Sequence, residues 1–414
     1  MSRERIVVTG LGAVTPYGIG IGPLAAGLFA GQSAIRPISG FDASDLAVRI
    51  AGEVPDFHPT DHISRHSVRR MDRFVQFALT ASREALRHAG LSQDALQAEQ
   101  TAVVMHTGAG GIPALVEAVG ISRQRSPGAT PPFIIARFAP NMASAQVAIE
   151  LGITGPTLTG TGACASGIMA IIEAMYLLRR GEVDLVIAGG AEACVTTIGI
   201  VGFDNLGVLS HQNDQPARAI RPFAIDRSGT VLAEGACVLV LERESHARAR
   251  NAPLLAEIAG GAITSDAWHL TAPDPSGIQL ARAMRMALSQ AELAPSDIDL
   301  AAVHATASAV GDPIEAAVLR TVFAEHHPNV AVSAIKSMVG HMIGAAGALS
   351  VLGVILGMQR GEIAPTINLD QVDPTCQLDH VVNQSRPALV RAAIANGLGF
   401  GGQNAVVALK RIDI

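Results

Sequence analysis

The chain has 414 residues, of which 49% are hydrophobic and 16% are charged, and it contains 42 glycines and 22 prolines. This composition excludes a disordered chain and a coiled coil. The formal net charge of −6 argues against nucleic acid or an anionic membrane as the main partner. The four cysteines are too few and too scattered for a disulfide scaffold, and they form no CxxC pair of the kind that binds zinc.

The start of the chain shows no targeting signal. Its basic first residues are followed by a short apolar run, residues 6–8, that enters Thr9-Gly10-Leu11-Gly12, and we interpret this as a β-strand and a turn. No uninterrupted stretch of about 18 apolar residues is present, so a membrane-spanning helix is not expected. We therefore expect a cytoplasmic protein.

Short β-branched runs alternate with longer stretches rich in Ala and Leu, which predicts a layered α/β architecture. The expected strands, in chain order, are residues 6–8, 102–105, 185–188, 236–241, 300–304, 330–333 and 406–409. The expected helices are residues 71–88, 166–180, 278–291, 314–323 and 345–359. Because the strands are apolar throughout, we expect both faces of the sheet to be covered.

Two segments 180 residues apart resemble each other. Ala165-Ser166-Gly167 leads through an apolar helix to Arg180-Gly181-Glu182, and Ala345-Ala346-Gly347 leads through another to Arg360-Gly361-Glu362. In both, the glycine is placed as a helix C-cap. Chance matches in helices rich in Ala and Gly are one reading, and an ancient duplication into two halves packed face to face is the other.

Cys164 follows a glycine-rich turn and comes at or just before the start of an expected helix. A thiol in this position feels the positive end of the helix dipole, which predicts a lowered pKa and an increased thiolate fraction. Its small neighbours are expected to leave the sulfur accessible. The alternative is a buried structural cysteine, which is how we interpret Cys194, Cys237 and Cys376.

Two histidines and a lysine occupy similar places at strand ends. His304 follows one expected strand, and His341 follows another by way of Lys336. Neutral imidazoles can donate N–H bonds to a developing enolate or carry protons. A structural role is the alternative for each. Lys336 is one of only two lysines in the chain, so it is not part of a general lysine-rich surface.

Residues 396–404 place four glycines around Phe400. As a loop, this segment would offer backbone N–H groups to an anion and would allow Phe400 to move. A plain connector is the alternative, although an exposed Phe between glycines suits that role poorly.

Together these segments resemble the β-ketoacyl-acyl-carrier-protein synthases, condensing enzymes of the thiolase-like superfamily, and most closely the type II elongating enzymes. The resemblance extends over essentially the whole chain. It rests on Val8-Thr9-Gly10-Leu11-Gly12-Ala13-Val14-Thr15-Pro16, Ala163-Cys164-Ala165-Ser166-Gly167, Ala188-Gly189-Gly190-Ala191-Glu192, Lys336-Ser337-Met338-Val339-Gly340-His341 and Gly399-Phe400-Gly401-Gly402.

The resemblance implies a thiolase-like, five-layered α/β/α/β/α fold made of two duplicated halves. We expect an N-terminal half, residues 1–250, that carries the nucleophilic cysteine, and a C-terminal half, residues 251–414, that carries the two catalytic histidines. The resemblance also implies a homodimer with a large apolar interface, or a heterodimer with a related subunit.

The family's Cys-His-His triad matches Cys164, His304 and His341. The implied reaction is a decarboxylative Claisen condensation, in which an acyl group on Cys164 is joined to malonyl-acyl carrier protein to give β-ketoacyl-acyl carrier protein. The two imidazoles would hold the enolate oxygen. No metal or organic cofactor is expected, since the substrates are carried on the phosphopantetheine of acyl carrier protein.

The resemblance assigns roles to residues around the triad. The N–H groups of Cys164 and Phe400 would form an oxyanion hole, and Phe400 would gate malonyl entry. The residues expected to accompany this turn or to orient the histidines are Gly399, Gly401, Lys336, Asp312 and Glu315. Those expected to contact substrate are Thr306, Ser308, Phe203, Thr230, Ala109 and His269. The basic residues expected to dock the carrier protein are Arg65, Arg69 and Arg70, for which a solvated helix face is the alternative.

Three positions depart from the family pattern. In the His304 segment, Thr306 keeps one of the two expected threonines and Ser308 replaces the other, which predicts altered contacts to the pantetheine arm. Thr230 stands where relatives have a Phe that lines the site, which predicts a wider and more polar cavity. Ala109 stands where a larger aliphatic residue often closes the acyl pocket. These departures favour an unusual acyl substrate, such as a polyene or polyketide chain.

Two other functions compete with this one. A non-catalytic partner subunit resembling a chain-length factor would share the fold, but such relatives usually replace the nucleophile that this chain keeps. A cysteine hydrolase would also place a Cys early and a His late, but it would explain neither the second histidine nor the loop around Phe400.

Overall fold

The computed structural model describes residues 4–412, apart from the side chain of residue 327. Its main sheet divides into two groups of strands with the same order. From its outer edge to the junction, the first group runs β6-β5-β7-β8-β1. The second runs β11-β10-β15-β16-β9 in the same direction, with β13 as an additional strand at its outer edge. We refer to the two groups as the first and the second sheet. In each group the strand pairs far from the junction, such as β5 with β7 and β10 with β15, are parallel. The pairs closer to the junction, such as β7 with β8 and β15 with β16, are antiparallel. The shared topology confirms the two duplicated halves.

The strands of the first group are β1 (Ile6–Thr15), β5 (Thr101–His106), β6 (Thr157–Leu158), β7 (Leu185–Glu192) and β8 (Gly235–Arg243). Those of the second group are β9 (Ala256–Ser265), β10 (Leu300–Ala302), β11 (Ala331–Ser333), β13 (Asp379–His380), β15 (Ala392–Gly399) and β16 (Gln403–Lys410). The groups meet where β1 pairs with β9 over two residues at each strand's end.

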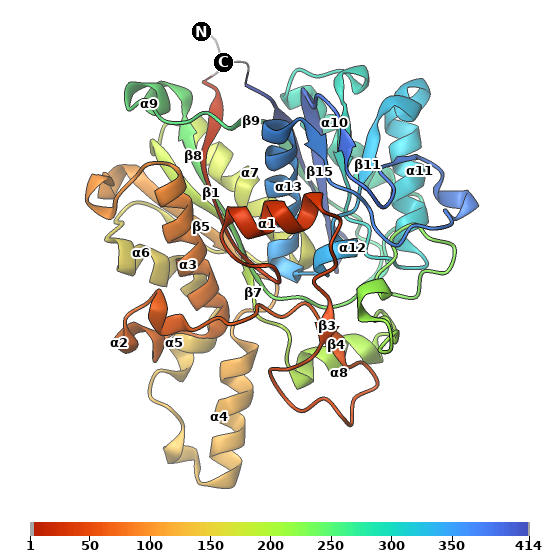
Figure 1. Ribbon diagram of the computed structural model, residues 1–414. Helices are drawn as coiled ribbons and strands as arrows, with labels where there is room; N and C mark the ends of the chain where they lie inside the picture. Colours follow the sequence, from red (N-terminus) through yellow and green to blue (C-terminus); the bar gives the residue numbers. More distant parts are fainter. Residues whose placement is uncertain (1–3, 413–414) are drawn as a thin grey trace.

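Helices cover both sheets and fill the space between them. Helix α3 (Arg73–His88) packs on the outer face of the first sheet with α6 (Met142–Leu151), and α10 (Ile278–Gln290) packs with α11 (Gly311–Phe323) outside the second. Helices α7 (Ser166–Arg179) and α13 (Ala346–Arg360) lie between the sheets and contact both. Figure 1 shows α3 at the left, α7 and α13 in the middle and α11 at the right. The five layers are those that the resemblance predicted.

Smaller helices complete the chain. They are α1 (Ile21–Phe29), α2 (Arg65–Val68), α4 (Ile112–Gln124), α5 (Ile134–Phe138), α8 (Thr197–Asn205), α9 (Glu244–Ala249) and α12 (Lys336–Val339). Helix α4 projects below the layered body in Figure 1.

The predicted turn at Thr9–Gly12 is wrong, because β1 continues through it to Thr15. The two glycines reflect close packing of α3 on the strand. A Cβ on Gly10 would lie 2.2 Å from the carbonyl oxygen of Ala85, and a Cβ on Gly12 would lie 2.0 Å from that of Ala81. Glycine at these two positions makes room for the backbone of α3. The pairing of β1 with β8 also shifts register at a bulge between Val8 and Gly10.

The predicted loop at residues 396–404 is also corrected. Asn396–Gly399 are the end of β15, and β16 begins at Gln403, so only residues 400–402 form the turn of a β-hairpin. Strands β9 and β15 were missing from the prediction because both contain glycines that weaken the strand pattern. A Cβ on Gly260 would lie 2.4 Å from the carbonyl oxygen of Ala287, which again reflects a closely packed helix.

One segment, Ile343–Arg360, is long and apolar enough to cross a membrane by length and composition, and 89% of it is buried inside the protein. It consists of a short 3₁₀ turn and α13, in the middle layer. Its hydrophobicity is therefore explained by packing, since a helix covered on all sides has no polar face.

Candidate active site

Cys164 lies at the entrance to the central layer. It belongs to a 3₁₀ turn, Ala163–Ala165, directly ahead of α7. Ser166 braces this turn, because its hydroxyl accepts from Gly162 N at 2.9 Å and donates to the Ala163 carbonyl at 2.7 Å. Ala163 has a φ of 48°, a conformation that residues with a Cβ rarely adopt. The strained, braced turn fixes the direction of the thiol.

The expected accessible, low-pKa thiolate is not what the resting site contains. The side chain of Cys164 is buried, with 5% of its surface exposed. Burial raises the pKa of the Cys164 thiol to about 12, although the charge of Lys336 and the backbone N–H groups of Cys164 and Phe400 act to lower it. Desolvation is the largest of these effects on the pKa of Cys164. Cys164 is therefore a thiol in the resting site, and its sulfur could react as a nucleophile only if a neighbouring group took the proton.

His341 lies beside the thiol, with its Nε2 3.0 Å from the Cys164 sulfur. Its backbone is held on both sides: its N–H donates to Val231 O at 2.8 Å, and its carbonyl accepts from Ala233 N at 2.9 Å. Burial and the positive charge of Lys336 hold the pKa of His341 well below its usual range. The imidazole is thus neutral and able to accept a proton.

His304 completes the predicted triad. Its ring lies 5.5 Å from that of His341, centroid to centroid, at an angle of 84°. Burial, followed by the charge of Lys336, holds its pKa well below the usual range as well. Two neutral imidazoles therefore lie next to each other, and one of them contacts the Cys164 sulfur. Such a pair is suited to donating N–H bonds to a developing negative charge.

Two buried charged residues, Lys336 and Glu315, hydrogen-bond to the backbone of His304. Lys336, with 2% of its surface exposed, donates from Nζ to the carbonyl of His304 at 2.5 Å. The Glu315 carboxylate accepts from His304 N and from Ala305 N, each at 2.8 Å, and from Asn396 Nδ2 at 3.0 Å. Burial lowers the pKa of Lys336 to about 8. These contacts fix the backbone of His304, and the role of Asn396 was not foreseen.

Asp312 contacts the loop that follows His304. It accepts from Ser308 N at 3.1 Å and from Phe223 N at 2.9 Å, so it fixes the loop after His304 and not the imidazole itself. Burial raises the pKa of Asp312 to about 7.

Phe400 lies at the tip of the β15–β16 hairpin. Its ring is 6.1 Å from that of Phe203, centroid to centroid. Gly401 donates from its N–H to the Leu270 carbonyl at 2.7 Å, which connects the hairpin to the loop that carries His269. Gly401 has a φ of 80°, whereas Gly399 is the last residue of the strand. The predicted gate is therefore a small hairpin tip tied to a neighbouring loop.

The predicted substrate residues fall into two groups. Thr230 is buried next to Val231, whose carbonyl binds His341, and its hydroxyl oxygen is without a hydrogen-bond partner in the described part of the chain. Phe203 packs on the apolar cluster that contains Cys164. In contrast, Ala109 and His269 are exposed.

The hydroxyls near His304 are placed differently from each other. Ser308 accepts from Gly311 N at 2.7 Å, so it caps the start of α11. Thr306 is partly exposed on the same loop.

His269, on the loop next to the β15–β16 hairpin, accepts at Nδ1 from Thr271 N and Ala272 N, so that its Nε2 can carry the proton.

The predicted docking residues lie on and just after α2. Arg65 and Arg69 are exposed, and no ion pair within residues 4–412 includes them. The guanidinium of Arg70 lies over the ring of Phe133, 4.8 Å from its centroid. Arg65 and Arg69 therefore present an exposed basic surface, whereas the Arg70 side chain packs on Phe133.

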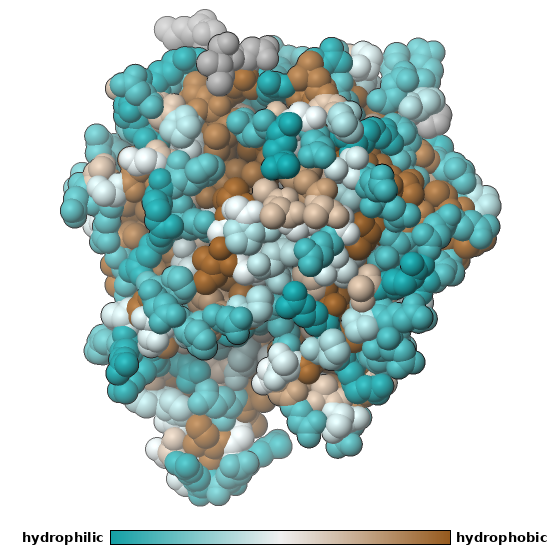
Figure 2. Space-filling view, viewed as in Figure 1, coloured by the Kyte–Doolittle hydropathy of each residue, from teal (hydrophilic) through white to brown (hydrophobic). Residues whose placement is uncertain are grey.

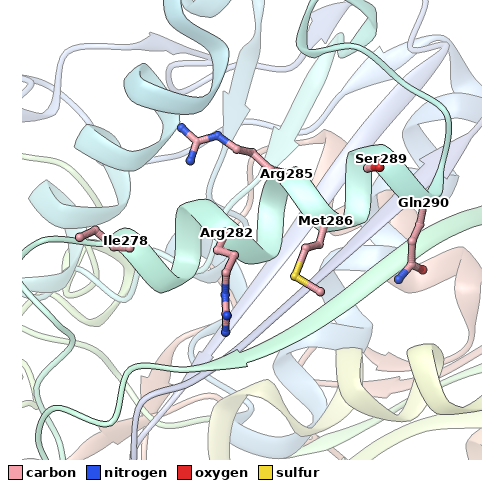
Figure 3. A pocket seen from close by; sticks show the side chains of 6 residues that line it. All are labelled: Ile278, Arg282, Arg285, Met286, Ser289 and Gln290. Atoms are coloured by element: carbon pink, nitrogen blue, oxygen red, sulfur yellow. The ribbon is translucent and has the colours of Figure 1, made fainter.

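A groove of about 550 Å³ on the outer helix α10 is separate from these residues. It is lined by Ile278, Arg282, Arg285, Met286, Ser289 and Gln290 (Figure 3). None of them belongs to the predicted site, and α10 covers the outer face of the second sheet, whereas Cys164 enters the middle layer.

A thiol and two neutral imidazoles at the centre of a duplicated five-layered fold define a thiolase-like condensing enzyme. Residues 3–247 match the β-ketoacyl synthase N-terminal domain, and residues 255–370 match the β-ketoacyl synthase C-terminal domain. The chain belongs to the β-ketoacyl synthase family. The predicted division between residues 250 and 251 stays a prediction, since helices from both halves form the middle layer.

Relatives specify the type. The chain is 40% identical to the 3-oxoacyl-[acyl-carrier-protein] synthase 2 of Synechocystis sp. over 99% of both chains. A structure described as the ishigamide ketosynthase/chain length factor superimposes with a TM-score of 0.94 at 35% identity, covering 100% of both chains. A type II polyketide synthase acyl-carrier protein in complex with its ketosynthase, AntDE:AntF bound to the hexaketide, matches with a TM-score of 0.92 at 28% identity, covering 99% of this chain and 100% of that one.

These findings confirm the predicted activity. The chain is an acyltransferase of the 3-oxoacyl-[acyl-carrier-protein] synthase 2 type, and it acts in the carrier-protein-dependent condensation of fatty acid or polyketide elongation. The roles of individual residues and the acyl substrate stay open at this level.

Proposed function

We propose that Cys164 carries the acyl chain and that His341 and His304 serve the condensation. The observation that carries this proposal is the 3.0 Å contact between the Cys164 sulfur and His341 Nε2, with a second neutral imidazole beside it. His341 takes the thiol proton as the sulfur attacks the thioester carbonyl, and the carrier's pantetheine thiol leaves with a proton. The N–H groups of Cys164 and Phe400 hold the oxyanion.

The second half of the reaction uses the same groups. Malonyl carrier protein loses carbon dioxide, and the electron pair of the broken C–C bond forms an enolate whose oxygen accepts N–H bonds from His304 and His341. The enolate carbon attacks the acyl carbonyl, the bond to the Cys164 sulfur breaks, and the β-ketoacyl chain leaves on its carrier. The sulfur departs as a thiolate and takes a proton from water to regenerate the resting thiol. The sequence of steps is balanced without an oxidant, a reductant, a metal or an organic cofactor.

The alternative of a non-catalytic partner subunit, resembling a chain-length factor, is disfavoured by the intact thiol–imidazole pair. Labelling with cerulenin, which traps the acylation-competent cysteine, separates the two. We expect a single adduct on Cys164 by peptide mass spectrometry. An unmodified Cys164 together with no condensation by the purified chain would overturn the catalytic assignment.

The acyl substrate is proposed to be a polar or conjugated chain, of polyene or polyketide type. Support comes from Thr230, whose buried hydroxyl stands where relatives have an aromatic ring, and from the neighbouring hydroxyls of Ser210 and Ser228, 3.2 Å apart. One structural neighbour is a type II polyketide synthase ketosynthase that is described as bound to the hexaketide.

A panel of acyl carriers tests this proposal. Saturated, conjugated and keto-acyl chains of equal length are supplied with malonyl carrier protein, and the products are weighed by mass spectrometry. We expect a higher kcat/KM for conjugated or keto chains, and Thr230→Phe should reverse that preference. Equal or greater use of saturated chains by the unaltered protein would refute it.

We also propose how the chain assembles and where it acts. Exposed apolar side chains gather on α4, α5 and α6, namely Leu115, Val116, Val119, Phe133, Ile135 and Ile149. Figure 2 shows apolar surface on the projecting α4 region. We propose that this face is covered by a second copy or by a related subunit, and that the protein acts in the cytoplasm. Light scattering of the purified chain, with and without candidate subunits, and cell fractionation test the two statements.

A further inference from the structure

Glu192 is a buried carboxylate whose role the sequence did not suggest. It is the last residue of β7, and none of its surface is exposed. Within residues 4–412, no ion pair includes it. A buried carboxylate without a cationic partner is costly, and it persists where hydrogen bonds and a function compensate for that cost.

Besides a hydrogen bond from the nearby Cys194 side chain, Glu192 accepts hydrogen bonds from two separate loops. Thr107 donates from its hydroxyl to Oε1 at 3.0 Å, and Gly108 N donates to Oε2 at 2.7 Å. Gly344 N also donates to Oε2, at 3.1 Å. Thr107 and Gly108 follow β5 in the first half of the fold, whereas Gly344 belongs to the second half. Glu192 therefore joins the two halves at the active site.

Two glycines lie at the closest approach of these loops. A Cβ on Gly108 would lie 2.7 Å from Glu192 Oε2 and 2.6 Å from Ile343 Cγ2. A Cβ on Gly344 would lie 2.4 Å from Gly108 N. The overlap at Gly344 is with backbone, so a larger residue there would separate the loops, whereas the overlaps at Gly108 are with the ends of two side chains.

The junction lies next to the reacting groups. Gly344 directly follows Ile343, whose φ of 42° is strained, and it is three residues after His341. The negative charge of Glu192 also acts on the thiol, because it is one of the causes that raise the pKa of Cys164. Burial raises the pKa of Glu192 itself, while hydrogen bonds from Gly108, Gly344, Thr107 and the Cys194 side chain act to lower it.

We propose that Glu192 is a positioning residue, which fixes the Ile343–Gly344 turn and thereby His341 against Cys164, and which also acts on the thiol through its charge. The inference rests on the proposed roles of Cys164 and His341. Glu192 touches neither substrate nor the reacting atoms, so its effect must appear in the reactivity of Cys164.

Two variants separate position from charge. Glu192→Ala removes both, whereas Glu192→Gln keeps a carbonyl oxygen for the two glycine N–H groups and an amide that can donate to Thr107. Glu84 supplies the matched control, because its carboxylate also joins two segments by accepting from Ala13 N and Ile21 N, each at 3.1 Å, but lies on the outer helix α3.

The measurements are the rate of acyl transfer from acyl carrier protein to the full-length enzyme, and the alkylation of Cys164 by iodoacetamide as a function of pH, followed by peptide mass spectrometry. For Glu192→Ala we expect kcat to fall by about 10- to 100-fold with KM within about threefold. Glu192→Gln should recover most of kcat, and its alkylation profile should move to lower pH because a negative charge has been removed. Glu84→Ala and Glu84→Gln should leave both readouts unchanged.

A folded Glu192→Ala enzyme with unchanged kcat and an unchanged alkylation profile would overturn the proposal. If Glu192→Ala does not fold, Glu192→Gln decides, and an alkylation profile identical to that of the unaltered protein overturns it. The alkylation readout needs no substrate. Failure of the unaltered protein to become acylated on Cys164 would instead refute the proposed function.

Discussion

Ala163 and Ile343 lie 180 residues apart and share the same left-handed backbone conformation, with φ angles of 48° and 42°. Each begins a 3₁₀ turn that leads into a central helix, α7 or α13. The first turn carries Cys164, and the second follows His341. The duplicated turns therefore bring the thiol and the imidazole together where the two halves meet. Each such conformation costs about 1–2 kcal/mol for a residue with a Cβ.

Relieving this strain should stabilise the protein. We expect Ala163→Gly to raise the free energy of unfolding by about 1 kcal/mol, as measured by urea denaturation. Ala174→Gly, in the buried interior of α7, is the matched control and should lower it by about 1 kcal/mol or more. Equal destabilisation by both substitutions would show that the φ of Ala163 is not strained in solution.

The nucleophile is tested by substitution of two buried cysteines. Cys164→Ala should reduce condensation by at least about 1,000-fold, because the acyl-enzyme cannot form. Cys376→Ala removes a buried thiol elsewhere and should keep the rate. Intact-protein mass spectrometry after incubation with acyl carrier protein should show an adduct only when Cys164 is present. Persistent acylation of Cys164→Ala would place the nucleophile elsewhere.

The chain offers a natural control for Lys336, since the only other lysine is Lys410. Lys336→Met removes the positive charge that lowers the pKa of Cys164 and the bond from Nζ to the His304 carbonyl. We expect the alkylation profile of Cys164 to move to higher pH and malonyl decarboxylation to slow by about tenfold or more. Lys410→Met should change neither. Identical behaviour of the two variants would mean that Lys336 is only a packing residue.

Asp312 should make stability depend on pH. Its pKa is raised by burial from 3.8 to about 7. Between about pH 4 and pH 7 the folded protein keeps a proton that the unfolded chain has lost, so the free energy of unfolding falls as the pH rises through this window. Asp312→Asn should flatten that slope, whatever its effect at a single pH. Chemical denaturation at several pH values checks this, and parallel slopes for the two proteins would contradict it.

The basic face of α2 should bind the carrier protein. Arg69→Glu should raise KM for acyl carrier protein by about tenfold and leave kcat nearly unchanged, with an effect that weakens as salt is added. Arg248→Glu on α9, a helix far from α2 in Figure 1, serves as the control. An equal change in KM for both variants would mean that only net charge matters.

Many features could be predicted from local sequence. The five expected helices are all present, because their apolar periodicity and glycine caps act within a few residues. The order of the motifs around Cys164, His304, Lys336 and His341 was enough to indicate the family. The strands β9 and β15 were missed, because a glycine that makes room for a neighbouring helix resembles a glycine that forms a turn.

The sequence by itself determined the α/β class, the family and the residue types that perform the chemistry, since these depend on short-range patterns. The duplicated layers followed only from the resemblance to that family. The tertiary structure decided how those residues behave. It buries Cys164 and raises its pKa, although the helix start alone predicted the opposite, because desolvation depends on everything packed around the sulfur. It also joins Glu192 to Gly344 across 152 residues, a contact that no local pattern encodes.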